Sequence, residues 1–125
     1  KASLKGKVIG AQRATIAGTW LEDNLGDVVE IKLYDTQENA YLDLSSGRVD
    51  GVLADKFVNW EWLKSDAGKD YEFKGEPVFD NDKIAIAVRK DDKALTAKLD
   101  AALKAIVDNG TYKQINDKYF PFSIY

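Results

Sequence analysis

Apolar and polar positions alternate between strand-like and helix-like spacing along the first half of the chain. The segments "KVIGAQ" (residues 7–12), "VVEIKLY" (28–34) and "VDGVLAD" (49–55) are short apolar runs typical of buried parallel strands. Between them, "IAGTWLEDN" and "TQENAYLDLSSGR" carry apolar residues at helical spacing. This βαβαβ order predicts an α/β fold, a mostly parallel sheet flanked by helices.

Cap residues are present where these helices should begin and end. Thr15 and Thr36 stand at the N-cap positions of the two helices, and Gly47 follows the second helix as a stop signal. A third helix is predicted over "KFVNWEWLKS" (residues 56–65).

The second half of the chain changes character. "YEFKGEPVF" (residues 71–79) is a weak strand interrupted by Gly75 and Pro77, and "KIAIAVRK" (residues 83–90) predicts a strong strand. Asp91 or Asp92 should cap a long amphipathic helix, which Gly110 ends; a short helix over "TYKQINDKYF" follows. The apolar stripe of the long helix is Leu95, Leu99, Leu103 and Ile106.

Composition removes several classes of function. The chain has 125 residues, enough for one ordinary domain, and no run approaches the roughly 18 apolar residues of a membrane helix. A net charge of -3, with 18 basic and 21 acidic residues, argues against a nucleic-acid partner. Cysteine and histidine are absent, which removes the thiolate nucleophile and the commonest general base and disfavours zinc and copper sites. No EF-hand or Walker spacing is present, so we expect a binding protein without metal or cofactor.

Ligands of open α/β sheets gather where parallel strands end and helices begin. The first such place runs from Gln12 to Ala17, where the hydroxyl of Thr15 and the backbone N–H groups of Ile16 and Ala17 could bind an anion. Capping of the helix by Thr15, with water on the other donors, is the alternative, and the sequence alone favours it slightly. The turn lacks the G-x-G-x-x-G pattern, because Ala14 stands where glycine is expected, so a dinucleotide is disfavoured.

The second place is Asp55, at the end of the third predicted strand. Its carboxylate could pair with an ammonium group, or it could cap the following helix; the two interpretations are evenly balanced and compatible. Together the two places match the two charged groups of a free α-amino acid.

Five segments in this order resemble the C-terminal half of the periplasmic substrate-binding proteins of polar amino-acid ABC transporters, in particular the lysine/arginine/ornithine, histidine and octopine/nopaline group. They are "LKGKVIGAQRAT", "LSSGRVDGVLAD", "GKDYEFKGEPV", "IAIAVRKDD" and "DNGTYKQINDKYF". The resemblance covers essentially the whole chain. It implies a type II periplasmic-binding-protein lobe, a flavodoxin-like half of a two-lobed protein that closes on its ligand.

The resemblance also implies a division of the chain. Residues 1–82 would form the second lobe, residues 83–90 a strand crossing the hinge, and residues 91–125 helices of the first lobe. On this division the N-terminal part of the first lobe, with its share of the binding site, would lie outside this chain.

Site residues follow from the same resemblance. Asp55 matches the aspartate that binds the α-ammonium group, and Thr15 and Ile16, with Ala17 next, match the loop that binds the α-carboxylate through backbone N–H groups. Gln12 matches the position facing the ligand side chain, where an amide suits basic or polar ligands. Arg13 receives no site role and is interpreted as a solvent-facing charge. Trp20, Trp60 and Trp62 are assigned to packing rather than to a cation-binding box.

The leading hypothesis is therefore an extracytoplasmic, periplasmic amino-acid receptor that delivers arginine, lysine, ornithine, histidine or a similar ligand to an ABC permease. We expect this chain to be a half-protein with an incomplete site and no signal peptide. The alternatives are an enzyme of the cyclohexadienyl dehydratase type, a ligand-sensing domain, or a half-protein that folds alone. The unpartnered leucine stripe predicts self-association, for example by exchange of residues 84–125.

Overall fold

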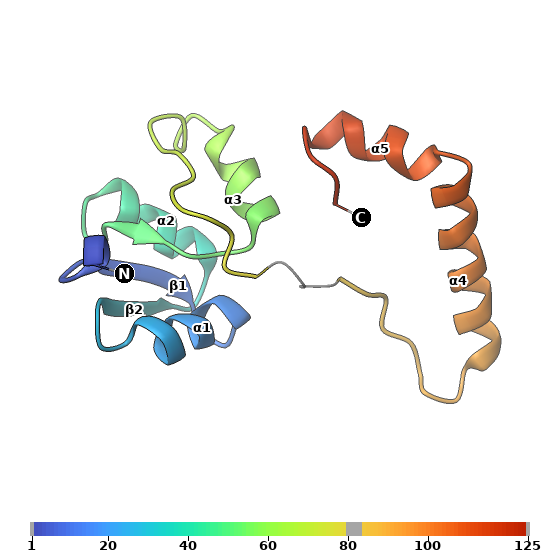
Figure 1. The fold of residues 1–125 in the computed structure, drawn as a ribbon, viewed down its shortest axis with the longest axis horizontal. Coiled ribbons are helices and arrows are strands. Elements are labelled where there is room, and N and C mark those ends of the chain that lie inside the picture. Colours follow the sequence, from blue (N-terminus) through green and yellow to red (C-terminus); the bar gives the residue numbers. More distant parts are fainter. Residues whose placement is uncertain (1, 80–83, 125) are drawn as a thin grey trace. The chain divides into compact units, whose positions relative to one another are not determined.

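The computed structural model describes residues 2–79 and 84–124 and divides into two compact units, Lys1–Glu76 (unit 1) and Pro77–Tyr125 (unit 2). The predicted boundary at residues 82 and 83 lies outside the described residues. Unit 1 runs in the order η1 (Ala2–Leu4), β1 (Val8–Gln12), α1 (Ile16–Leu25), β2 (Glu30–Tyr34), α2 (Gln37–Ser45), β3 (Gly51–Val52) and α3 (Lys56–Leu63). Unit 2 contains α4 (Lys93–Asp108) and α5 (Thr111–Tyr119) (Figure 1).

The sheet of unit 1 is parallel, with strand order β2-β1-β3, which confirms the predicted α/β class. The central strand β1 pairs with β2 along its whole length, from Val8 opposite Glu30 to Gln12 opposite Tyr34. β3 is shorter than predicted: its pairing with β1 covers Gly51 and Val52, opposite Ile9 and Gly10.

Alternation along β1 gives each face of the sheet its own helix. Ala11 is fully buried in a cluster with Leu21 and Leu25 of α1, so this face packs against α1. Gly10 points the other way: a Cβ there would lie 3.1 Å from the ring of Tyr34, whose hydroxyl donates to Asp43 of α2. Figure 1 shows the two helices on either side of the strands. Such a sandwich leaves the ends of the strands open, as a binding edge requires.

The chain between α3 and α4 departs from the sequence prediction. Residues 84–90 form no strand, and neither do residues 71–79, so both predicted strands are wrong in the described part of the chain. A strand needs a neighbour for its backbone N–H and C=O groups, and the described residues of unit 2 offer no sheet. The left-handed Gly75 (φ 85°) and Pro77 also interrupt the earlier run. Ile84 and Ile86 are consequently 84% and 57% exposed.

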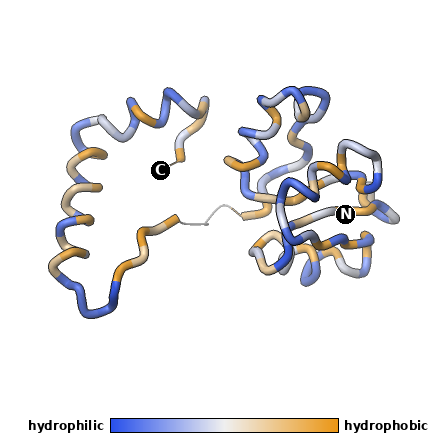
Figure 2. Tube along the Cα trace, turned by 180° about the vertical axis from the view of Figure 1, so that it is seen from behind, coloured by the Kyte–Doolittle hydropathy of each residue, from blue (hydrophilic) through white to orange (hydrophobic). Residues whose placement is uncertain are grey.

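The long helix of unit 2 forms as its pattern predicts. Asp92 caps α4 by accepting a hydrogen bond from the backbone N–H of Leu95 at 3.0 Å, and the left-handed Gly110 (φ 80°) follows the helix end. Hydrophobic positions recur along α4 (Figure 2), and no residue of this helix is buried. Among the described residues, no helix is long and apolar enough to cross a membrane.

The end of unit 2 is held by one buried amide. Asn116 of α5 is only 6% exposed; its Nδ2 donates to the carbonyl of Phe122 at 2.9 Å, and its Oδ1 accepts from the N–H of Ile124 at 2.9 Å. Both ends of the amide are therefore satisfied by the backbone of the C-terminal tail.

Candidate functional site

The three strands end at one edge of the sheet, which we call the carboxyl edge: Gln12 and residues 13–17 after β1, residues 35–37 after β2, and residues 53–57 after β3. All five predicted ligand-binding residues lie on it. Gln12 ends β1, Thr15 caps α1, Ile16 and Ala17 form the first turn of α1, and Asp55 caps α3. The structure thus brings the two predicted places to the same edge.

Thr15 performs the capping role. Its Oγ1 donates to the carbonyl of Gln12 at 2.7 Å and accepts from the N–H of Gly18 at 3.2 Å. The backbone N–H groups of Ile16 and Ala17 meet no acceptor in the described part of the chain. Because they are donors at a helix N-terminus, these two groups remain able to bind an anion while Thr15 caps the helix.

The turn that presents these donors is tight. A Cβ at Gly18 would lie 3.1 Å from the carbonyl oxygen of Gln12, so glycine lets α1 begin directly against the end of β1. Ala14, between them, has φ 56° in the left-handed region, where residues other than glycine, asparagine and aspartate are uncommon. The missing glycine noted in the sequence is therefore replaced by an alanine under backbone strain.

Asp55 also performs its capping role and retains capacity for a ligand. Its Oδ1 accepts from the N–H groups of Phe57 at 2.7 Å and Val58 at 3.2 Å. Its Oδ2 accepts no hydrogen bond among the described residues. A carboxylate has about four acceptor positions, so the cap leaves room for a cation.

A charged pair on the carboxyl edge was missed by the sequence reasoning. The Nε of Arg13 lies 2.9 Å from Oδ1 of Asp35, and its Nη2 donates to the carbonyl of Leu33 at 3.3 Å. The backbone N–H of Arg13 donates to the carbonyl of Tyr34 at 2.8 Å. Arg13 is therefore a link between two loops rather than only a solvent-facing charge. A signal for Asp35 was present, because it directly follows the strand predicted over residues 28–34.

Beneath this edge, a network of charges fixes β2 against α2. Asp43 accepts from the hydroxyl of Tyr34 at 2.6 Å, from Arg48 and from Lys32. The hydrogen bond from Arg48, followed by that from Tyr34, holds the pKa of Asp43 well below its usual range. Burial, together with the hydrogen bond to Asp43, raises the pKa of Tyr34 to about 12. The network therefore anchors the residue that precedes Asp35.

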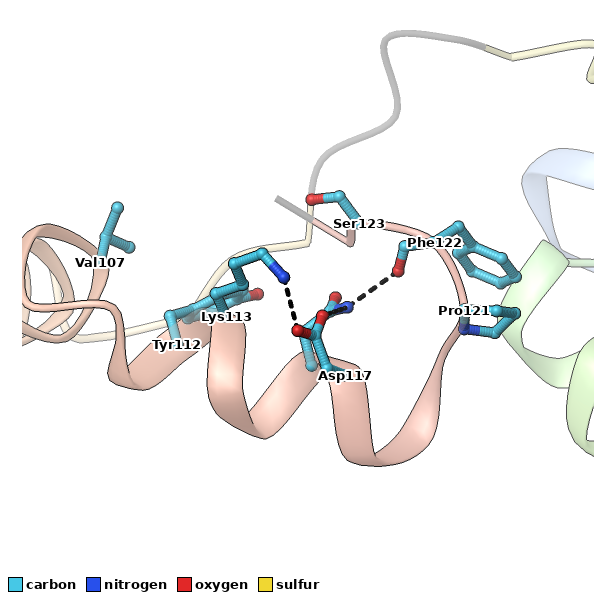
Figure 3. Close-up of a pocket in the computed structure, with 8 residues that line it drawn as sticks. Val107, Tyr112, Lys113, Asp117, Pro121, Phe122 and Ser123 are labelled. Carbon is cyan, nitrogen blue, oxygen red and sulfur yellow. Dashed lines mark hydrogen bonds and ion pairs between the residues drawn. The ribbon is translucent and has the colours of Figure 1, made fainter.

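Other candidate places offer no competing site. Trp62 stacks on Tyr41 with ring centroids 4.3 Å apart, which confirms packing for this tryptophan. A hollow of about 370 Å³ in unit 2 lies between α5 and the tail, where Lys113 pairs with Asp117 (Figure 3). None of the predicted ligand-binding residues lines it. Within residues 2–79 and 84–124, no three acidic side chains gather into a metal site.

Comparison with known proteins places these features in one family. The model of "Bacterial extracellular solute-binding proteins, family 3" matches residues 5–122. The L-arginine-binding protein of Pseudomonas aeruginosa is 45% identical over 100% of this chain and 51% of its own length. The lysine/arginine/ornithine-binding periplasmic protein of Escherichia coli is 38% identical over 98% of this chain and 50% of its own length.

Solved structures agree. A periplasmic binding protein of Salmonella typhimurium described as highly arginine-specific superposes with a TM-score of 0.75 at 33% identity, over 95% of this chain and 54% of that chain. An ancestral arginine-binding protein bound to arginine gives 0.71 at 33% identity, over 95% and 53%. This chain spans about half the length of the relatives it matches. It belongs to family 3 of the bacterial extracellular solute-binding proteins.

Proposed function

We propose that unit 1 carries half of a binding site for a basic or polar L-amino acid. The observation that supports this most directly is the combination of two N–H groups without acceptors, on Ile16 and Ala17, with a carboxylate at Asp55 on the same edge of the sheet, all within the described part of the chain. The N–H groups would bind the α-carboxylate, and Asp55 would bind the α-ammonium group through a charge-assisted hydrogen bond. Gln12 would contact the ligand side chain.

The rest of the site would lie on a second lobe. Relatives twice as long, named for binding arginine, lysine, ornithine or histidine, support an assignment of residues 1–82 to lobe two. On that assignment residues 83–90 cross the hinge, and residues 91–125 belong to lobe one. The complete protein would work outside the cytoplasm, in the periplasm, the compartment that the name of the lysine/arginine/ornithine-binding relative gives. It would deliver the amino acid to an ABC permease. Ligand contacts made only in the closed form would drive closure.

A thermal-shift screen tests the ligand. Amino acids should raise the melting temperature little for this chain alone, because it offers one half-site. They should raise it clearly once an N-terminal half, for example that of the Pseudomonas aeruginosa relative, is added, since a ligand that binds only the folded state stabilises it. A screen in which no amino acid stabilises the folded, complemented protein would contradict the proposed function.

The substitution Asp55→Asn separates capping from ligand binding. Asparagine caps helices about as well as aspartate, so the unfolding free energy should change little, while the charge that binds the ammonium group is lost. The affinity of the complemented protein for the amino acid should fall by at least about tenfold, as is typical when a charge-assisted hydrogen bond is lost. Equal affinity in the two proteins would remove Asp55 from the site.

An enzyme of the cyclohexadienyl dehydratase type is disfavoured. The relatives compared are binding proteins, and besides Asp55 the carboxyl edge offers Asp35, whose carboxylate is paired with Arg13. We infer that the chain performs no chemistry on its ligand. Incubation with prephenate or arogenate should leave the product absorbance at the buffer level, and turnover that disappears in Asp55→Asn would establish the enzyme instead.

We also propose self-association through unit 2. Leu95 and Leu103 are each 41% exposed, Ile84 is 84% exposed, and large apolar faces of this kind are usually covered by protein. Exchange of residues 84–125 between two copies would cover them. Light scattering should report a mass above 13.9 kDa, and a strict monomer at high concentration would reject the proposal.

A further inference from the structure

The amide of Gln12 is held in one orientation by the loop after β2. Its Nε2 donates to the backbone carbonyl of Asp35 at 3.2 Å. A carbonyl oxygen can only accept hydrogen bonds, so the nitrogen of the amide must face it, and Oε1 is the atom left to contact a ligand. Within the described part of the chain, Oε1 of Gln12 accepts no hydrogen bond. The residue that holds this amide, Asp35, also carries a charge.

That charge is balanced by the residue next to Gln12. The guanidinium of Arg13 pairs with the Asp35 carboxylate at 2.9 Å, and its second contact, 3.3 Å to the carbonyl of Leu33, holds it against the end of β2. The side chains of Arg13 and Asp35 are 58% and 77% exposed, so neither charge is sequestered in the core. The charges of Arg13 and Asp35 cancel, but either residue alone would give this part of the carboxyl edge a net charge.

We propose that the Arg13–Asp35 pair determines the charge preference of the subsite beside Gln12, and that both residues are specificity-determining. This inference rests on the proposed amino-acid site. With the pair intact, the fixed Oε1 acceptor of Gln12 favours ligand side chains that donate hydrogen bonds, such as guanidinium, ammonium or amide groups, over carboxylates. Removing Asp35 leaves Arg13 unbalanced and shifts the preference towards anionic side chains; removing Arg13 shifts it towards cationic ones.

Titration followed by nuclear magnetic resonance tests this on the chain itself. The backbone amide signals of Ile16 and Ala17 report occupancy of the carboxylate half-site, and L-arginine, L-citrulline and L-glutamate differ in side-chain charge. Titrations in about 0.1 M salt, up to tens of millimolar amino acid, give three dissociation constants for each protein. Citrulline retains the shape of arginine without its charge, so it separates charge from size.

The two substitutions should act in opposite directions. Asp35→Asn should weaken the binding of arginine relative to that of citrulline by about fivefold and strengthen the binding of glutamate by a similar factor. A change of this size corresponds to the interaction energy of two unit charges about 4 Å apart in water. Arg13→Gln should do the reverse. Both effects should shrink in about 0.5 M salt, because exposed charges are screened. Both positions are exposed, so the fold should tolerate the changes.

Matched controls lie at the opposite ends of the same strands. Lys7→Gln removes a cation just before β1, and Glu30→Gln removes a carboxylate from the first position of β2. A five-residue strand spans roughly 15 Å, beyond the screening length of about 10 Å at 0.1 M salt, so neither control should change the ligand ratios.

The outcomes separate this inference from the proposed function. If the Ile16 and Ala17 signals respond but the arginine-to-glutamate ratio stays within about twofold in Asp35→Asn and Arg13→Gln, the pair has no role in specificity and the half-site stands. If no amino acid moves these signals, the half-site itself is wrong and the inference fails with it.

Discussion

Units 1 and 2 use apolar residues in opposite ways. Unit 1 buries Ala11, Leu21 and Leu25 between the sheet and α1, at 0%, 1% and 5% exposure. In the described part of unit 2, the buried residue is an asparagine, Asn116, while Ile84 and Leu103 face outward. Both units form their helices, so local signals suffice for helices in either unit. Only unit 1 has a buried apolar core among the described residues, so the helices of unit 2 form without one.

The largest expected effect comes from the core of unit 1. Leu21→Ala should lower its free energy of unfolding by about 2–5 kcal/mol, because it removes buried methyl groups and leaves a cavity. Leu103→Ala, at a 41% exposed position of α4, should change it by less than about 0.5 kcal/mol. Urea unfolding followed by tryptophan fluorescence measures unit 1 alone, since Trp20, Trp60 and Trp62 all lie in it. Equal effects of the two substitutions would erase the contrast between the units.

The buried amide of unit 2 should give the next largest effect. Asn116→Ala leaves the Phe122 carbonyl and the Ile124 N–H without their partners, a loss of about 1–3 kcal/mol of local stability. Hydrogen exchange at Ile124 should accelerate, whereas the fluorescence transition of unit 1 should not move. Gln114→Ala, an exposed neighbour on α5, is the control. Unchanged exchange at Ile124 would show that the tail is not held by this amide.

The helix ends and the central strands could be predicted from the sequence because their causes are local. Thr15, Thr36 and Asp55 cap the helices that follow them, as their positions indicated. The strand predicted over residues 83–90 is wrong for the described residues 84–90, because strand formation depends on a neighbour that the described part of unit 2 does not contain.

The candidate site shows the same division. The cap at Asp55 can be predicted from its local sequence. The Arg13–Asp35 pair depends instead on the register of β1 against β2, which brings together residues 22 positions apart. From the sequence alone, Arg13 is interpreted as a solvent-facing charge and Asp35 receives no role. Only the parallel pairing of the strands brings them together.

Acid should weaken unit 1 through Asp43. The folded-state pKa of Asp43 is lowered by Arg48 and Tyr34, so its contribution is present above its unfolded pKa of about 4 and is lost as the pH falls through the folded value. The urea midpoint of unit 1 should therefore fall between about pH 5 and pH 2, and Asp43→Asn should flatten this dependence. Asp66→Asn removes an exposed carboxylate that forms no ion pair in the described part of the chain, and serves as control. An identical pH profile in Asp43→Asn would contradict the account.

The smallest expected effect is a gain. Ala14 is held at φ 56°, which costs an L-residue about 1–2 kcal/mol. A glycine at this position would relieve the strain, but part of the gained stability would be lost because glycine gives up more conformational entropy on folding. Ala14→Gly should therefore stabilise unit 1 by up to about 1 kcal/mol in urea unfolding. Ala17→Gly, inside α1, should destabilise it instead. Destabilisation by both would show that the turn is not strained.

The central claim is that this chain combines one folded unit with half of an amino-acid site. Calorimetric titration of the isolated, monomeric chain with L-arginine tests it most directly. The account predicts heats too small to fit, or a dissociation constant weaker than about 1 mM, which corresponds to roughly -4 kcal/mol of binding free energy. Micromolar binding by the monomer would contradict the account, because the carboxyl edge of unit 1 would then be a complete site.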